Sequence, residues 1–363
     1  MEKSRTVLIV SAQHSAHLVS ELPRIFKNRG FRVVVLGFPH YSLTYCSAID
    51  EWIEAPSDLN QVLQIASKLV LNRAFEMIIL APDALLWALY DTKNGKLLEQ
   101  LSPIGNPRYW HLLSGKIEVA SLLKELNILS PPSKAACSSE EALNAAKELG
   151  YPVMLKISRS GGGNGVIRCD SPKHIIDAPF SYDRPILVEK FIEGELISVE
   201  PLFVSGKLRA YSYSKMTDLY GPYAPSLERY FLPCSDIEST LTLLGSTLNW
   251  TGFANMTFFF DSGKHYLFEI DFRPTRWIRQ SELAQVNWSE ALKDPSSPLQ
   301  KPQISKTVRH FPADFYNALT SKDLSRTCYW LFNRNQCWKS IPKENPKLFL
   351  GAAIHLIKKA LSI

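Results

Sequence analysis

The sequence has no run of eighteen or more apolar residues, which is about the length a helix needs to cross a membrane. Its apolar start at residues 7–10 is too short for a secretory signal peptide and lacks a cleavage site. The six cysteines are scattered without Cys-x-x-Cys pairs, and the eight histidines form no ligand cluster. These absences argue against a zinc site or a disulfide framework, and they predict a cytoplasmic protein.

Two familiar nucleotide-binding signatures are also missing. The glycine-rich stretch at 160–166 is not followed by the Gly-Lys-Ser/Thr of a P-loop. The expected strand-to-helix turn at 11–15 has no glycines, so the sequence predicts no NAD site there. With 363 residues, of which 45% are hydrophobic and 21% charged, the chain is long enough for two or three globular domains.

The first hundred residues alternate between short apolar runs and amphipathic stretches. This rhythm predicts a parallel sheet covered by helices, a Rossmann-like domain over 1–105 that serves as a support. We expect strands at 7–10, 32–36 and 77–80 and helices at 16–29 and 58–71.

An acidic strand is the most informative stretch of the sequence. Glu269, Asp271 and Arg273 are each two residues apart, so in a strand all three project from one face. Aromatic residues around an Asp-Ser-Gly turn at 261–263 predict that this strand closes a hairpin. Two carboxylates on one face suit Mg²⁺, which proteins hold with one or two carboxylates plus nucleotide phosphates. The alternative is a solvated strand face with a local ion pair.

A lysine followed by a glycine-rich loop forms the second segment. Lys156 lies in a short apolar strand, where its ammonium would act as a point charge on phosphates. Glycines in the loop permit backbone conformations in which successive N–H groups wrap phosphate oxygens. The loop residues that we expect to contact the nucleotide are Ser160, Gly161, Gly162, Gly163 and Gly165.

The third segment is a strand that delivers Glu189 and a short linker ending at Gly194. An adenine needs an apolar slot and polar groups along its edge. Phe191 and Ile192 could supply the slot and the backbone contacts, next to Lys190, and Glu189 could accept from the exocyclic amine.

In this order, the three segments resemble the ATP-grasp superfamily of ATP-dependent carboxylate ligases, over roughly residues 6–290. The resemblance implies a Rossmann-like domain, then an ATP-binding unit of two α+β lobes, which we place at 106–290 with a mobile lobe at about 134–188. It implies that Lys116, just before a helix, and Lys156 hold phosphates of ATP and that Glu269 and Asp271 hold Mg²⁺. It also implies that Arg273 stabilises the charge of the intermediate.

Two positions depart from the family pattern. The further metal ligand expected on the strand before the hairpin is Thr257, with Asn255 two residues earlier, so a second metal ion stays open. The ribose-binding glutamate is expected at the position of Leu196, and Glu195 lies one residue early, on the opposite strand face.

By resemblance, ATP would phosphorylate a small-molecule carboxylate to an acylphosphate, which an amine would then attack. One alternative is a biotin-dependent type of carboxylase, in which bicarbonate is activated. The other is a degenerate nucleotide-binding module with a regulatory role. Lys215 and Arg229 flank an aromatic, irregular segment where the acceptor could bind, although solvated surface charge is the simpler interpretation.

The C-terminal extension, 291–363, is predicted to be basic and mostly helical. Residues 301–363 carry eleven Lys and Arg against three Asp and Glu. An anionic membrane surface or an acidic partner could bind there, but helices packed on the catalytic unit are the plainer interpretation. No nucleic-acid recognition module is evident, and the sequence is compatible with a homodimer.

Overall fold

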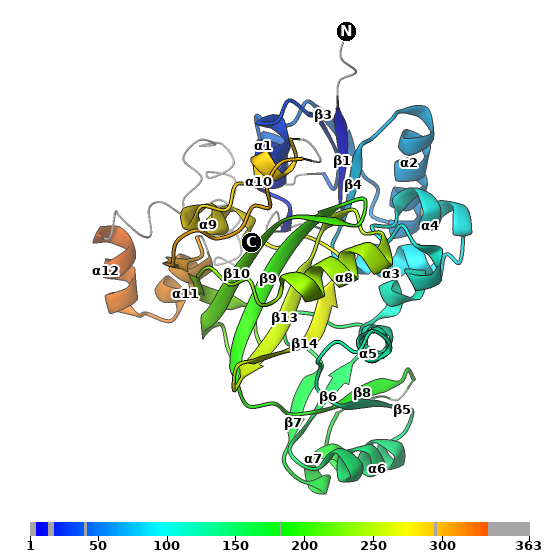
Figure 1. Cartoon of the computed structure of the whole chain (residues 1–363), viewed down its shortest axis with the longest axis vertical. Helices are drawn as coiled ribbons and strands as arrows, with labels where there is room; N and C mark the ends of the chain where they lie inside the picture. Colours follow the sequence, from blue (N-terminus) through cyan, green and yellow to red (C-terminus); the bar gives the residue numbers. More distant parts are fainter. Residues whose placement is uncertain are drawn as a thin grey trace.

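The computed structural model describes residues 5–13, 18–39, 42–179, 181, 183–293, 296–311 and 313–332. Three sheets follow one another along the long axis of the molecule (Figure 1). A parallel sheet lies at one end, a large antiparallel sheet in the middle and a small antiparallel sheet at the other end (Figure 1). This confirms the predicted class, an α/β first unit followed by α+β units.

The N-terminal sheet has the strand order β3-β2-β1-β4, and all its pairs are parallel. Asp58 caps the second helix: its side chain accepts from the Gln61 N–H at 2.8 Å. The helix expected at 16–29 is shorter than predicted in its described part, which excludes 14–17. The elements are β1 (Thr6–Ser11), α1 (Leu22–Lys27), β2 (Arg32–Gly37), β3 (Glu51–Glu54), α2 (Leu59–Asn72), β4 (Met77–Ala81), α3 (Asp83–Asp91) and α4 (Gly95–Leu101).

The large sheet has the order β14-β13-β9-β10-β11-β15, with β12 pairing with β9. Its hairpin turns at Ser262 and Gly263, whose φ values of 48° and 77° suit the tight turn that the sequence predicted. The segment 215–229, expected to be irregular, is strand at both ends. The elements are β9 (Glu195–Val204), β10 (Lys207–Leu219), β11 (Ser226–Phe231), α8 (Glu238–Leu248), β12 (Gly252–Phe253), β13 (Asn255–Asp261), β14 (Lys264–Asp271) and β15 (Lys306–Arg309).

The small sheet, ordered β5-β8-β6-β7, carries two helices on one face (Figure 1). The Ser138 side chain caps the first helix by accepting from the Glu141 N–H at 3.1 Å, and Gly150 ends it at φ 75°. A separate hydrophobic core lies between sheet and helices. The elements are β5 (Ser133–Ala136), α6 (Ser139–Leu149), β6 (Val153–Ile157), β7 (Val166–Cys169), α7 (Pro172–Ile176) and β8 (Ile186–Lys190).

One continuous core joins the first unit to the large sheet. It includes Leu86 of α3, Leu112 of the 3₁₀ helix η3 (Pro107–Ser114), Leu122 of α5 (Lys116–Glu125) and Ile270 of β14. This packing fixes α3 and the start of α5 against the acidic strand, where the charged residues of interest lie.

The described part of the C-terminal extension packs on the large sheet. Trp330 is buried, and its indole N–H donates to Asp314 Oδ2 at 2.6 Å. Arg309 and Arg326 are ion-paired with Asp218 and Asp314. Its described helices are α11 (Ala313–Thr320) and α12 (Leu324–Phe332), and the short elements before it are α9 (Ile278–Ser281), η4 (Glu282–Ala284) and α10 (Trp288–Ala291). The rest of the basic extension, 333–363, lies outside the described residues.

Within the described ranges, no helix has both the length and the apolar character needed to span a bilayer.

Candidate active site

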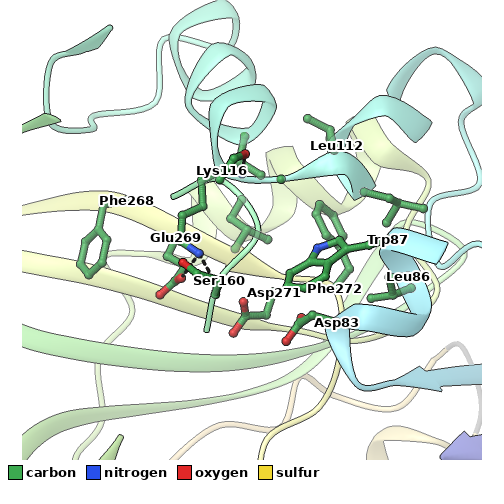
Figure 2. A pocket seen from close by; sticks show the side chains of 15 residues that line it. Asp83, Leu86, Trp87, Leu112, Lys116, Ser160, Phe268, Glu269, Asp271 and Phe272 are labelled. Carbon is green, nitrogen blue, oxygen red and sulfur yellow. Dashed lines mark hydrogen bonds and ion pairs between the residues drawn. The ribbon is translucent and has the colours of Figure 1, made fainter. Parts of the chain in front are cut away.

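A cavity of about 300 Å³ lies where the small sheet meets the large one. Its walls come from β6, the glycine loop, the start of α5, and one face of β9, β10, β11, β13 and β14. A smaller cavity beside it, shown in Figure 2, shares with it Lys116, Ser160, Phe268, Glu269 and Asp271. The predicted site residues that line the larger cavity are Lys116, Lys156, Ser160, Gly161, Gly162, Gly163, Glu269, Asp271 and Arg273.

The acidic strand presents its carboxylates to this cavity. Glu269 and Asp271 line it, whereas Ile270 between them is buried in the core. Pairing with β13, whose register shifts between Thr257 and Phe258, puts Thr257 opposite Glu269 and Asn255 opposite Asp271. Asp271 Oδ2 accepts from Asn255 Nδ2 at 3.0 Å.

Lys116 is the first residue of α5 and points toward the acidic strand (Figure 2). Its Nζ lies 3.3 Å from Glu269 Oε1 and donates to the Ser160 carbonyl at 2.6 Å. The Lys116 ammonium, at the start of the helix, therefore contacts both the glycine loop and a predicted metal ligand. In this position it would neutralise phosphates bound between the loop and the strand.

Lys156 forms an ion pair with Glu189, and both side chains are buried, with residue exposures of 5% and 2%. Register explains the pairing: Met154 lies opposite Glu189, so Lys156 is its diagonal neighbour on the same face. Burial raises the pKa of the Glu189 carboxyl, and the charge of Lys156 opposes this. The Lys156 Nζ also lies 4.4 Å from the centroid of the Phe268 ring, which lines the cavity.

The glycine loop is closed against the turn between β10 and β11. Gly162, Gly163 and Gly165 have φ values of 66°, 84° and 68°, in the region that favours glycine. A Cβ on Gly163 would lie 2.6 Å from the Tyr223 carbonyl oxygen. The absence of a side chain at Gly163 is what allows the two segments to meet over the cavity.

Replacing Gly163 by Ala should therefore open the loop. A left-handed residue other than glycine costs about 1–2 kcal/mol, and the contact with backbone adds to this, so we expect the KM for ATP to rise roughly tenfold or more. Gly161→Ala is the matched control, since a Cβ there meets nothing within 4 Å. Steady-state ADP release measures both. Equal KM values for the two variants would show that loop closure does not matter.

The predicted adenine linker and ribose residue do not line the cavity. Lys190 donates to the Gly150 carbonyl at 2.7 Å. The Arg168 guanidinium carbon lies 4.3 Å from the centroid of the Phe191 ring. Glu195 pairs with Lys215 at 2.7 Å at the surface, and Leu196 lines the cavity in its place. Gly165, Glu189, Lys190, Phe191, Ile192 and Glu195 are not among the residues that line the cavity, and their nucleotide contacts stay predictions.

Asp83 is a residue of this site that sequence reasoning missed. It begins α3, and its Oδ2 accepts from Arg273 Nε at 2.6 Å, although 190 residues separate the two. Arg273 Nη2 also lies 3.1 Å from Asp271 Oδ2, so two carboxylates hold this guanidinium. Burial raises the pKa of Asp83 to about 6. The negative charges of Asp271 and Glu269 also raise this pKa, whereas the positive charge of Arg273 lowers it. No local pattern marks Asp83, because only the packing of α3 on β14 brings it there.

This pKa predicts a pH dependence of stability. Between pH 4 and 6 the native state holds the Asp83 proton and the unfolded state does not, so the free energy of unfolding should fall as pH rises through this window. In the native protein we expect the free energy of unfolding to fall by on the order of 1–3 kcal/mol across this pH window, and Asp83→Asn should remove this fall. Urea unfolding at each pH measures it. Asp91→Asn, on the same helix, is the control, because hydrogen bonding from Arg159 lowers the pKa of Asp91. A slope unchanged by Asp83→Asn would contradict the assignment.

Two arginines, Arg229 and Arg276, line the cavity near β11. The interpretation of Arg229 as a solvated surface charge is wrong. Arg229 is 5% exposed, pairs with the fully buried Glu200 and lies 4.5 Å from the centroid of the Trp277 ring. Arg276, which the sequence analysis missed, lines the same end and donates to the Ser226 carbonyl at 2.7 Å. Lys215, paired with Glu195, is a surface charge as the simpler interpretation held.

The donor set of the acidic strand fits a hard cation. Among the described residues, no group of three or more His, Cys, Asp and Glu side chains could hold a metal ion by itself. Glu269 and Asp271 supply two carboxylates on the cavity wall. That number suits Mg²⁺, which completes its coordination with phosphate oxygens and water.

Comparison with known proteins agrees with this layout. Residues 115–195 match the family model described as "Carbamoyl-phosphate synthase L chain, ATP binding domain". The arginine-specific large chain of carbamoyl phosphate synthase from Bacillus subtilis is 24% identical over 178 residues, 46% of this chain and 17% of that protein. The chain thus matches about a sixth of the length of this relative.

Two solved structures share most of the fold. N5-carboxyaminoimidazole synthetase from Staphylococcus aureus has a TM-score of 0.65 at 14% identity and covers 92% of this chain and 87% of its own. The biotin carboxylase domain dimer of the Hydrogenobacter thermophilus 2-oxoglutarate carboxylase, solved with MgADP and bicarbonate, has a TM-score of 0.63 at 19% identity. It covers 83% of this chain and 72% of its own. At these identities the likeness establishes a shared fold.

Proposed function

We propose that this ATP-grasp protein is an ATP-dependent ligase that activates a carboxylate as an acylphosphate for attack by an amine. The observation that supports this most directly is one cavity lined by Lys116, Lys156 and the glycine loop on one side and by Glu269, Asp271 and Arg273 on the other. Basic side chains and backbone N–H groups thus line the same cavity as two carboxylates, as nucleotide phosphates with Mg²⁺ require.

The residues of this chain would act mainly by positioning and by neutralising charge. Lys116 and Lys156 bind phosphate oxygens, and the glycine loop covers them. Glu269 and Asp271 would hold Mg²⁺, which when bound neutralises phosphate charge. Arg273, oriented by Asp83 and Asp271, faces the negative charge that develops as the carboxylate oxygen meets phosphorus. Closure of the loop on the Tyr223 turn keeps water from the acylphosphate.

A second candidate, activation of bicarbonate, is favoured by the cationic end at Arg229 and Arg276, which could hold a small anion. The named relatives include a biotin carboxylase domain solved with bicarbonate, so this reaction class deserves a direct comparison. That domain was solved as a dimer. A homodimer of this chain stays a prediction, which light scattering can test. The cytoplasmic location also stays a prediction.

The test is trapping of the acylphosphate. Purified protein is incubated with ATP, Mg²⁺ and hydroxylamine over a panel of amino acids, dipeptides, sugar acids and bicarbonate, and both ADP and hydroxamate are measured. Hydroxamate formed in step with ADP for one acid supports the ligase. Turnover with bicarbonate alone favours the second candidate. A thermal shift with ATP and Mg²⁺ but no ADP with any member of the panel would indicate a nucleotide-binding module without catalysis.

A further inference from the structure

The turn that meets the glycine loop is carried by two strand ends with like charges. Residues 220–225 join β10 to β11, and Tyr223 and Pro225 of this turn line the cavity. Just before and after the turn, Asp218 of β10 lies opposite Glu228 of β11. Carboxylates directly opposite each other on paired strands are destabilising. The two strand ends therefore repel each other unless cations lie beside them.

Two cations from the C-terminal extension lie beside this acidic pair. Arg309 of β15 is 2.8 Å from Glu228 Oε2 and 3.3 Å from Asp218 Oδ2. Arg326 of α12 donates to Asp218 Oδ2 at 2.6 Å. The register between β10 and β11 shifts on both sides of Asp218, an irregularity of the kind that redirects a side chain. The carboxylate of Asp218 is thus presented to both arginines.

Both arginines are also anchored inside the extension, by Asp314 of α11. Asp314 is fully buried, and its Oδ1 lies 3.2 Å from Arg309 and 3.6 Å from Arg326. Its Oδ2 accepts from the Trp330 indole N–H at 2.6 Å. The ends of β10 and β11 are therefore attached to the packed helices α11 and α12.

We propose that Arg326 is a positioning residue for nucleotide binding: by neutralising Asp218, it holds the 220–225 turn where the glycine loop closes on it. The inference rests on the proposed function, because the loop matters only if it covers a nucleotide. The path is short, since Asp218 lies two residues before the turn and the turn brings the Tyr223 carbonyl against Gly163. Arg326 and Asp218 do not line the cavity, so they act on the nucleotide only through this turn.

The test is a titration of the full chain with MgADP. Arg326→Gln leaves Asp218 and Glu228 paired with Arg309 alone among the described residues, and we expect the Kd to rise roughly three- to tenfold. Arg326→Lys should retain most of the affinity, because the charge is kept. Adding Asp218→Asn to Arg326→Gln should return the Kd to within about twofold of the native value, since the repulsion between the strand ends is then removed.

Two further comparisons separate this role from simple docking of the extension. Arg24→Gln is the matched control: its pair with Glu282 has side-chain exposures of 23% and 29%, against 23% and 27% for Arg326 and Asp218, and neither residue lines the cavity. Its Kd should equal the native value. In a Gly163→Ala background, Arg326→Gln should change the Kd by less than about twofold, because the loop no longer closes on the turn.

Hydrogen exchange gives a readout that needs no ligand. The Ala224 N–H donates to the Gly221 carbonyl within the turn, and this amide should exchange faster in Arg326→Gln than in the native protein or Arg24→Gln. An unchanged Kd in Arg326→Gln, no recovery on adding Asp218→Asn, or the full loss again in the Gly163→Ala background would overturn the inference alone. If the native protein fails to bind MgADP, the proposed function is wrong and the inference falls with it.

Discussion

Replacing Glu269 by Gln should lower ATP turnover about 10²–10³-fold while leaving the protein folded. Glu269 lies on the cavity wall within 3.3 Å of Lys116, where it would hold Mg²⁺ together with Asp271. Removing one of two carboxylates weakens binding of the cation. It therefore also weakens the charge stabilisation on which phosphoryl transfer depends. The fold should tolerate the change, because the Glu269 side chain is 29% exposed and a partly exposed pair contributes about 0–1 kcal/mol.

The measurement is ADP release as a function of Mg²⁺ concentration. A metal ligand predicts a higher Mg²⁺ requirement in Glu269→Gln, with partial recovery of turnover at high Mg²⁺. The control is Asp261→Asn, at the turn end of the same hairpin, which should retain native turnover. Near-native activity of Glu269→Gln would show that the acidic strand is not the metal site.

The acidic strand was predictable because everything that defines it is local. Alternation places Glu269 and Asp271 on one face, and the turn at 262–263 fixes where the hairpin reverses. The order of lysine strand, glycine loop and acidic strand then implied the fold. The first unit was predictable for the same reason, since its parallel strands are continuous apolar runs.

What escaped prediction depends on contacts between distant segments. Asp83 joins Arg273 only through the packing of α3 on the large sheet. Arg229 was assigned to the surface from its charge alone, but its burial follows from the Glu200 partner on β9, two strands away. The pairing of Lys156 with Glu189 depends on the β6–β8 register, which neither strand's own sequence fixes.

That pairing changes the outcome expected for Lys156, for which the sequence alone predicts loss of turnover in a folded protein. Lys156→Met should abolish ATP turnover, because it removes the charge that we propose binds phosphate, but it should also destabilise the protein by about 3–5 kcal/mol. The cost arises because Glu189, 2% exposed, is left without its partner. Since burial already raises the pKa of Glu189, the variant should regain stability as pH falls and this carboxyl is protonated.

The double variant Lys156→Met with Glu189→Gln separates the two roles. Replacing both charges removes the unpaired buried carboxylate, so most of the lost stability should return. Turnover should not return, because the ammonium that we propose binds phosphate is still absent. Urea unfolding and ADP release on the same preparations measure the two quantities. Recovery of turnover in the double variant would mean that Lys156 serves the fold of the small sheet and not the nucleotide, and the phosphate site would then rest on Lys116 and the glycine loop.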